Sequence, residues 1–284
     1  MTMVANLPDK MLVPQPAVVV GRTQESPSIF TLKLRLEDGV AQASFRHSLG
    51  QFNMLYLPGV GEVPISIMSD PEDQQAIGHT IRAVGRVTNR LAELQIGDRI
   101  GLRGPFGRGW PIENMKGRDV VVITGGLGCA PVVAVIHYIL RRRTDYGHLT
   151  IIQGVKKAED LIWREQYAQW NTHPDTHVMV AADEGGPLWP WHVGRVTDLF
   201  GRIPMQPDKA MAVMCGPEGM MVVSARMLAE HGMPEENMFL SMERNMHCAV
   251  GHCGHCQFGG AFICKDGPVF SWPQVKGLIA HRGF

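Results

Sequence analysis

The sequence predicts an α/β plus all-β protein: an antiparallel β-barrel, then a doubly wound parallel-sheet domain, then a short cysteine-rich loop. Three observations support this fold class. Short apolar runs fill the first third of the 284 residues, strand–helix pairs fill the middle, and four of the six cysteines lie within 17 positions near the end. This length suits two packed domains. We place the boundaries at residues 12–113, 114–240 and 241–284.

Residues 12–113 consist of Val-, Ile-, Leu- and Thr-rich runs separated by Gly, Pro and Asp, such as SIFTLKLRL, QFNMLYLP and HTIRAVGRVT. These runs are short and closely spaced, and no long 3.6-residue apolar period runs through them. Short strands at such spacing are typical of an antiparallel barrel.

From about residue 116 the pattern changes to a buried strand followed by a helix. DVVVITGG ends in glycines, and PVVAVIHYILRRR follows with Pro131 suited to a first helical turn and three arginines suited to a last one. The pairing returns in HLTIIQGV with DLIWREQYAQW, and in KAMAVMCGP with GMMVVSARMLAEHG. Alternating strands and helices predict a mostly parallel sheet.

The tail contains CAVGHCGHCQFGGAFIC, in which Cys248, Cys253, Cys256 and Cys264 have the spacing C-x4-C-x2-C-x7-C. Crowded cysteines in a reducing compartment favour metal binding over disulfides. The first three match the plant-type [2Fe-2S] loop, although the fourth comes much sooner than in plant ferredoxins. A four-thiolate zinc site is the alternative, but zinc more often uses paired C-x2-C knuckles. We therefore predict a [2Fe-2S] cluster on these four metal ligands.

Two glycine-containing turns join predicted strands to predicted helices. The first turn contains Thr124, Gly125, Gly126 and Gly128, and the second contains Cys215, Gly216 and Pro217. Both come to the carboxyl edge of a parallel sheet, where glycines admit a pyrophosphate and helix N-termini offer free N–H groups. Neither is a G-x-G-x-x-G motif, and ordinary turn glycines explain either one alone. Together they favour a dinucleotide crevice.

Three barrel segments are candidates for a second phosphate-bearing ligand: VPISIM, HTIRAVGRVTNRL, and RGPFGRGWP with Gly104 and Gly107. Arg82 can pair with phosphate, and Gly85 with Thr88 can supply N–H and hydroxyl donors. The same segments need no function as barrel strands and turns. The residues alone leave this second ligand open.

Composition and charge exclude several classes of partner. Lys plus Arg and Asp plus Glu are both 27, so no overall field attracts nucleic acid or an anionic membrane. The first residues lack a secretory signal pattern, and no stretch reaches the roughly 18 apolar residues of a membrane span. We expect a cytoplasmic protein that recognises its partners locally.

With these three parts in this order, the chain resembles the ferredoxin-reductase superfamily, in which a flavin-binding barrel precedes a nicotinamide-binding domain. GVGEVPISI, RGPFGRGWP, GGLGCAP, MCGPEGMM, SMERNMHC, CGHCQ and CKDGPVF are most similar to the gamma (diaphorase) subunits of cytoplasmic NAD(P)-linked nickel–iron hydrogenases, or sulfhydrogenases. The same subgroup contains the corresponding subunit of anaerobic sulfite reductase and the electron-transfer subunit of dihydroorotate dehydrogenase. The resemblance runs from about Pro14 to Phe270.

The resemblance implies particular cofactor-binding residues. It places FAD beside Pro64, Ile65 and Ser66, with Arg82, Val84, Gly85 and Thr88 around its ribityl chain and diphosphate, and a nicotinamide nucleotide at Gly125, Gly126, Gly128, Cys215, Gly216 and Pro217. The superfamily's flavin motif R-x-Y-[ST] is altered here, because Pro64 and Ile65 stand where its arginine and tyrosine would be. Lys156, after the second parallel strand, is placed to pair with the 2′-phosphate of NADP(H). It equally suits a solvated turn.

The implied function is an NAD(P)H-dependent oxidoreductase subunit that moves electrons between the nucleotide, FAD and a [2Fe-2S] cluster. No residue is given an acid–base role. The expected partners are iron–sulfur and nickel–iron hydrogenase subunits, because this chain lacks the two separated C-x2-C pairs of a nickel site. The same module serving anaerobic sulfite reductase or dihydroorotate dehydrogenase is one alternative. A zinc-stapled scaffold without redox activity is the other.

Overall fold

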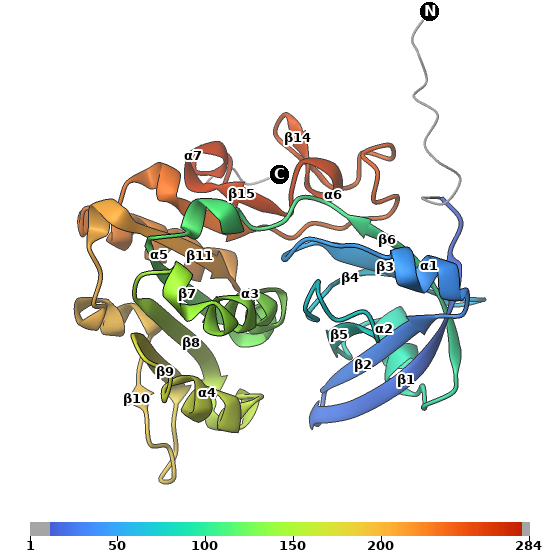
Figure 1. Ribbon diagram of the computed structural model, residues 1–284, viewed down its shortest axis with the longest axis horizontal. Helices are drawn as coiled ribbons and strands as arrows, with labels where there is room; N and C mark the ends of the chain where they lie inside the picture. The colour runs from blue at the N-terminus through green and yellow to red at the C-terminus, as the bar shows by residue number, and fades with distance from the viewer. Residues whose placement is uncertain (1–11, 280–284) are drawn as a thin grey trace, which may run out of the picture.

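The computed structural model describes residues 12–279 and places a barrel beside a layered α/β domain, with the tail lying across both (Figure 1). The barrel strands are β1 (Gln15–Ser26), β2 (Ile29–Leu36), β3 (Phe52–Leu57), β4 (Gly61–Ser66), β5 (Ile77–Arg82) and β6 (Arg99–Phe106), with helices α1 (Gly39–Ser44) and α2 (Arg86–Ala92). Their order is β4-β3-β6-β1-β2-β5, and every pairing between neighbours is antiparallel. This agrees with the predicted barrel.

The two edge strands of this sheet, β4 and β5, come together and close the barrel. His79 on β5 hydrogen-bonds through Nδ1 to the carbonyl oxygen of Ser66 on β4 at 2.9 Å, and Met68 N donates to Gly78 O at 2.9 Å. A closed sheet leaves no long exposed edge for unwanted pairing. The end of β4 and the end of β5 are therefore neighbours, which matters for the site below.

The α/β domain contains the second sheet. Its strands are β7 (Asp119–Gly125), β8 (Leu149–Lys157), β9 (Thr176–Glu184), β10 (His192–Val193), β11 (Ala210–Cys215), β12 (Met238–Ser241) and β15 (Val269–Ser271), and its helices are α3 (Ala130–Arg141), α4 (Arg164–Trp170) and α5 (Glu218–Glu230). The order is β10-β9-β8-β7-β11-β12-β15, parallel throughout except for β15. Short 3-10 helices lie at 112–115, 126–129, 143–145, 158–160, 196–202, 207–209 and 235–237.

The central strands are buried on both faces, which explains their continuous apolar sequences. Val120 and Val122 of β7 belong to the same core as helix α3, whereas Val121 and Ile123 share the opposite core with α5. The chain leaves β7 toward β8 on one side and β11 lies on the other. In such a doubly wound sheet the crevice for a ligand opens at the carboxyl ends of the strands, where the strand order reverses.

The tail packs against both domains. It contains the hairpin β13 (Gln257–Phe258) and β14 (Ala261–Phe262), helices α6 (Ile263–Asp266) and α7 (Trp272–Val275), and strand β15, which adds to the α/β sheet beside β12. Cys256, Phe258 and Cys264 are buried in the same core as Phe52 and Phe106 of the barrel. Arg108 N donates to Gly267 O and Met242 N to Pro268 O, so hydrogen bonds also hold the tail.

Among residues 12–279, no helix is long and apolar enough to cross a lipid bilayer.

Candidate functional site

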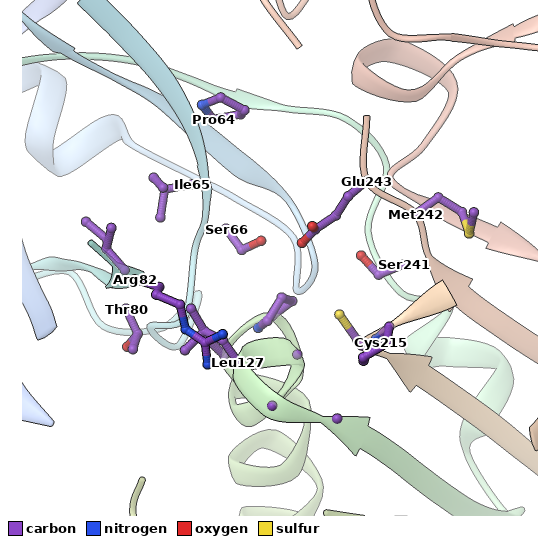
Figure 2. A pocket seen from close by; sticks show the side chains of 18 of the residues that line it. Pro64, Ile65, Ser66, Thr80, Arg82, Leu127, Cys215, Ser241, Met242 and Glu243 are labelled. Atoms are coloured by element: carbon purple, nitrogen blue, oxygen red, sulfur yellow. The ribbon is translucent and has the colours of Figure 1, made fainter. Parts of the chain in front are cut away.

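A cavity of about 580 Å³ opens between the two domains at the carboxyl edge of the parallel sheet (Figure 2). Twelve of the residues that the sequence singled out line it: Pro64, Ile65, Ser66, Arg82, Val84 and Thr88 from the barrel, and Gly125, Gly126, Gly128, Cys215, Gly216 and Pro217 from the α/β domain. The chain therefore brings both predicted sites to one space. A ligand held by the barrel would face a ligand held by the glycine turns.

The barrel wall of this cavity is supported by a buried histidine. His79 lies behind β4, donates from Nδ1 to Ser66 O, and contacts Asn53 Nδ2 through Nε2 at 3.2 Å. Burial lowers the pKa of His79 to about 4, so the ring is neutral near pH 7 and Nε2 accepts the amide N–H. This network fixes the end of β4. In Figure 2 the side chain of Ser66 points into the space that Cys215 and Glu243 also face.

Arg82 ends β5 and lines both the first cavity and a second one beside it. Its buried Nε has no hydrogen-bond partner within residues 12–279, and its Nη2 lies 4.0 Å from the Cβ position of Gly126. A buried guanidinium nitrogen that has no acceptor among these residues is available to an external anion. The structure thus places a cation between the barrel wall and the first glycine turn.

Gly85 and Thr88 differ from the simple expectation of free donors. The backbone N–H groups of Val84 and Gly85 donate to Thr88 Oγ1 at 3.1 and 2.9 Å, and the Thr88 hydroxyl donates to Gly85 O. These contacts form the start of helix α2, where a hydroxyl satisfies the amides that the helix leaves open. Thr88 still lines the cavity, but Gly85 does not.

The two glycine turns touch each other through backbone atoms. A Cβ on Gly128 would lie 2.2 Å from Cys215 O, and one on Gly216, whose φ is 153°, would lie 2.8 Å from Gly125 N. Only glycine permits this approach. It brings the N-termini of α3 and α5 to the same edge, where their free amides can bind phosphate.

Thr124, Gly104 and Gly107 lie outside the lining of this cavity and of the second one beside it. Thr124 is buried and its hydroxyl donates to Gln153 Oε1 at 2.5 Å; the amide of Gln153 in turn donates to Gly126 O and supports the turn. Gly104 and Gly107 have φ of 138° and 78°, and a Cβ there would meet Asn53 or Gly267 O. Gly104 and Gly107 are therefore required by the backbone conformation and by the close packing around them.

The second cavity, of about 520 Å³, runs from Arg82 and Gly126 along the ends of β8 and β10. Lys156, which lies within β8 and not after it, lines this cavity together with Arg195 and Thr197, which the sequence did not indicate. Two carboxylates, Asp160 and Asp183, lie on the same wall. The second cavity therefore combines cationic side chains, which suit a phosphate, with carboxylates, which suit sugar hydroxyls.

Four further residues of the first cavity, Ser241, Met242, Glu243 and Arg244, were also missed. They begin with the last residue of β12, Ser241, and continue directly after it, so the carboxyl-edge rule that found the two glycine turns could have found them. A domain boundary placed at residue 240 assigned them to the tail instead. Burial and then the nearby Glu243 carboxylate raise the pKa of the Cys215 thiol well above its usual range. Cys215 therefore remains a thiol.

The four tail cysteines form two contacting pairs. Cys253 interacts with Cys248, and Cys264 with Cys256, while backbone N–H groups point at the sulfurs: Gly251 N to Cys264 at 3.1 Å, His252 N to Cys248 at 3.2 Å and Cys264 N to Cys256 at 3.5 Å. Amide donors from His255 and Cys248 lower the pKa of Cys253, whereas burial raises that of Cys264 to about 12. As they stand, no three His, Cys, Asp or Glu side chains in the described part surround one metal ion. Two pairs with amide donors fit a two-iron centre.

Two family models match the chain. Residues 122–226 match the oxidoreductase NAD-binding domain, and residues 243–276 match the iron-sulfur cluster binding domain of dihydroorotate dehydrogenase B. The first spans β7 to α5 and both glycine turns. The second spans all four tail cysteines.

Curated relatives match most of the chain. It is 36% identical over 247 residues to sulfhydrogenase 1 subunit gamma of Pyrococcus furiosus, and the aligned region covers 85% of each protein. It is 32% identical over 265 residues to the probable dihydroorotate dehydrogenase B (NAD(+)) electron transfer subunit of Methanopyrus kandleri, covering 93% of this chain and 92% of the relative. These matches confirm the resemblance inferred from the sequence motifs.

A solved structure confirms the predicted fold class. A chain from the NADH-dependent reduced ferredoxin-NADP oxidoreductase, studied for flavin-based electron bifurcation, superposes with a TM-score of 0.72 at 22% identity and covers 93% of both chains. At this identity the likeness concerns the fold.

Proposed function

Because the chain belongs to the family of the sulfhydrogenase gamma subunits and the dihydroorotate dehydrogenase B electron transfer subunits, we propose that it carries electrons between NAD(P)H, FAD and a [2Fe-2S] cluster. One observation carries the proposal. Strand β4 of the barrel faces the two glycine turns across one cavity, and the rim of that cavity leads from Ser241 to Arg244 directly into the cysteine tail. This arrangement supports a path from the nucleotide through the flavin to the cysteine tail.

Each ligand has residues of this chain to hold it. Pro64, Ile65 and Ser66 would lie along the flavin ring and Arg82 at its diphosphate, while the turns at Gly126 and Gly216 would hold the nucleotide diphosphate. A bound FAD would supply hydride exchange with the nicotinamide and one-electron transfer to the next carrier. The protein supplies orientation: His79 fixes β4, and the touching turns fix the crevice.

The two buried thiols near the glycine turns are given no proton-transfer role. Cys215 is buried and remains a thiol, and burial also raises the pKa of Cys129 to about 12. Neither thiol is a nucleophile at neutral pH, since the thiolate is the reactive form. Orientation of the bound ligands is then the main contribution of this cavity.

Cys248 with Cys253, and Cys256 with Cys264, would each hold one iron of the cluster. The amides aimed at their sulfurs stabilise negative charge there, which tunes a cluster's reduction potential. Cys253 is exposed, whereas Cys256 and Cys264 are buried. The exposed side of the cluster is where we place contact with the next electron carrier.

The proposal also includes the identity of the partner subunits. We infer a complex with iron–sulfur and nickel–iron hydrogenase subunits, because relatives named as sulfhydrogenase gamma subunits share 36% and 34% identity with the chain. Service to a dihydroorotate dehydrogenase is supported by relatives at 30–34% identity. A cytoplasmic location belongs to the same proposal, since six free cysteines suit a reducing compartment.

Electron paramagnetic resonance of the anaerobically purified protein tests the relay. Spectra are taken before and after NADPH, NADH in a parallel tube, and dithionite. A spin-½ iron–sulfur signal with a nucleotide supports the relay, and the faster nucleotide names the physiological one. A signal with dithionite alone contradicts the flavin or nucleotide assignment. Silence with dithionite in a zinc-loaded sample favours the zinc-stapled scaffold and refutes electron transfer.

A further inference from the structure

An ion pair that the cofactor assignments do not use lies between the barrel and the cysteine tail. Arg103 on β6 contacts Glu62 on β4 in two places, from Nε to Oε1 at 2.7 Å and from Nη2 to Oε2 at 2.6 Å. The side chain of Arg103 is 6% exposed and that of Glu62 is 20% exposed. Its guanidinium also lies 5.5 Å from the ring centre of Phe106. Two-point contact of this kind fixes direction as well as distance.

The third face of the same guanidinium reaches the tail. Arg103 Nη1 donates to the carbonyl oxygen of Cys248 at 3.3 Å, across 145 residues of sequence. Cys248 is the first of the four cysteines, and its sulfur accepts N–H groups from His252 and Cys253. Arg103 thus fastens the residue at which the cysteine loop begins.

Glu62 connects this contact to the other cofactor site. It lies on β4 two residues before Pro64, and residues two apart on a strand project from the same face. Pro64, Ile65 and Ser66 form the barrel wall of the first cavity. One short strand therefore carries the wall at one end and the carboxylate that holds Arg103 at the other.

The cation of the pair contacts the backbone of one of the four cysteines, so its charge lies beside the cysteine loop. A reduction potential depends on the charges and hydrogen bonds around the sulfurs. With both partners present the charges offset each other. Removal of one partner leaves the other uncompensated in a half-buried setting, where solvent screening is weaker than at the surface.

We propose that Glu62 and Arg103 form a positioning pair, which holds the cysteine loop against the flavin strand and sets the cluster's reduction potential through its charge balance. The inference rests on the proposed electron-transfer function. Neither residue touches a reacting atom; both act through β4 and Cys248. The two roles, charge and tether, make separate predictions.

Potentiometric titration of the reduced-cluster resonance signal tests the role of charge. Glu62→Gln leaves the cation alone and raises the midpoint potential of the cluster, whereas Arg103→Gln leaves the carboxylate alone and lowers it. The double variant restores neutrality and returns the potential close to wild type. A purely structural role moves both single variants in the same direction or leaves both unchanged, and either result overturns the proposal.

The tether is tested in the double variant by stopped-flow reduction with the preferred nucleotide. Its cluster potential is near wild type, yet cluster reduction is slower by about tenfold or more, because a displaced loop misplaces the acceptor. Wild-type speed in the double variant overturns the tether. Arg103→Lys keeps the charge but loses the two-point contact, so it shows slow reduction at unshifted potential, and a fast rate there also contradicts the proposal.

Arg99→Gln is the matched control. Arg99 lies on the same strand β6 and pairs with Glu37 at 2.6 Å, but it is 77% exposed. Its removal should change neither potential nor rate. If Arg103→Gln does not assemble a cluster, the Glu62→Gln variant alone tests the role of charge. A rise in its midpoint potential supports the proposal, and a fall or no change overturns it. Absence of the wild-type signal with dithionite refutes the proposed function itself, whereas a normal wild-type signal with unshifted variants refutes this inference alone.

Discussion

Replacement of Gly128 by alanine tests whether the two glycine turns must touch for nucleotide to bind. The added Cβ would lie 2.2 Å from Cys215 O and 2.8 Å from Gly216 N, and both are backbone atoms that no rotamer change can move. To reach an ordinary contact of 3.4 Å, the turns must separate by about 1.2 Å. Overpacking of this kind costs about 1–3 kcal/mol.

The same separation widens the crevice in which helix N-termini converge on the nucleotide diphosphate. A loss of about 1–3 kcal/mol corresponds to about 5- to 150-fold weaker binding. We expect Gly128→Ala to bind oxidised NADP or NAD less tightly by a factor in that range, measured by calorimetric titration. Its cluster signal with dithionite should match wild type, because the four cysteine sulfurs belong to a separate segment.

Gly39→Ala provides the control for an added methyl group. Gly39 begins helix α1 on the barrel, and a Cβ there meets no atom within 4 Å. Its nucleotide affinity should equal that of wild type, with stability unchanged or slightly raised by the lower entropy of the unfolded chain. Wild-type affinity and unfolding free energy in Gly128→Ala would refute the steric argument.

Three further predictions concern the cluster, the buried histidine and the nucleotide. Cys256→Ala removes a thiolate ligand and should abolish the dithionite-reduced resonance signal while flavin absorbance remains. For His79, the folded pKa of about 4 lies below the unfolded 6.5, so its contribution to stability is complete above pH 6.5 and falls as the pH drops toward 4; wild type should lose about 2 kcal/mol by about pH 5, and His79→Gln correspondingly less, by urea unfolding. Lys156→Ala should weaken NADPH binding by about 5- to 10-fold, the value of one exposed charge–phosphate contact, and leave NADH binding unchanged.

Much of the fold could be predicted because its signals are local in sequence. The switch from short alternating runs to apolar strands followed by helices marks the change from barrel to parallel sheet, and β7 with α3 lies where that pattern places it. The two glycine turns were found for the same reason. A strand end, a glycine and a helix start are contiguous, and parallel pairing of β7 with β11 then brings the two turns together.

Local signals fail where one residue type serves two purposes. Gly104 and Gly107 look like ligand-binding glycines in RGPFGRGWP, but their positive φ and close neighbours show that the backbone itself requires them. Gly85 likewise serves the start of helix α2. A glycine in the sequence shows that no side chain is present at that position. It does not show whether the space is occupied by neighbouring backbone or by a ligand.

Long-range pairs carry no sequence signal at all. Glu62 and Arg103 are 41 residues apart, and Arg103 and Cys248 are 145 apart. Each is an ordinary charged or metal-binding residue in its own segment. Only the packing of the tail on the barrel brings them together, so this connection between the two cofactor sites had to come from the structure.

The altered flavin motif leaves a cation near the cavity, on the neighbouring strand β5. Pro64 stands on β4 where the superfamily motif has an arginine, which removes one cation from the barrel wall. Strands β4 and β5 meet where the barrel closes, so a cation at the end of either strand reaches the same cavity. Arg82 ends β5, lines that cavity and keeps an unpartnered Nε within the described residues. Arg82 therefore offers a guanidinium nitrogen to an anionic ligand at this wall of the cavity.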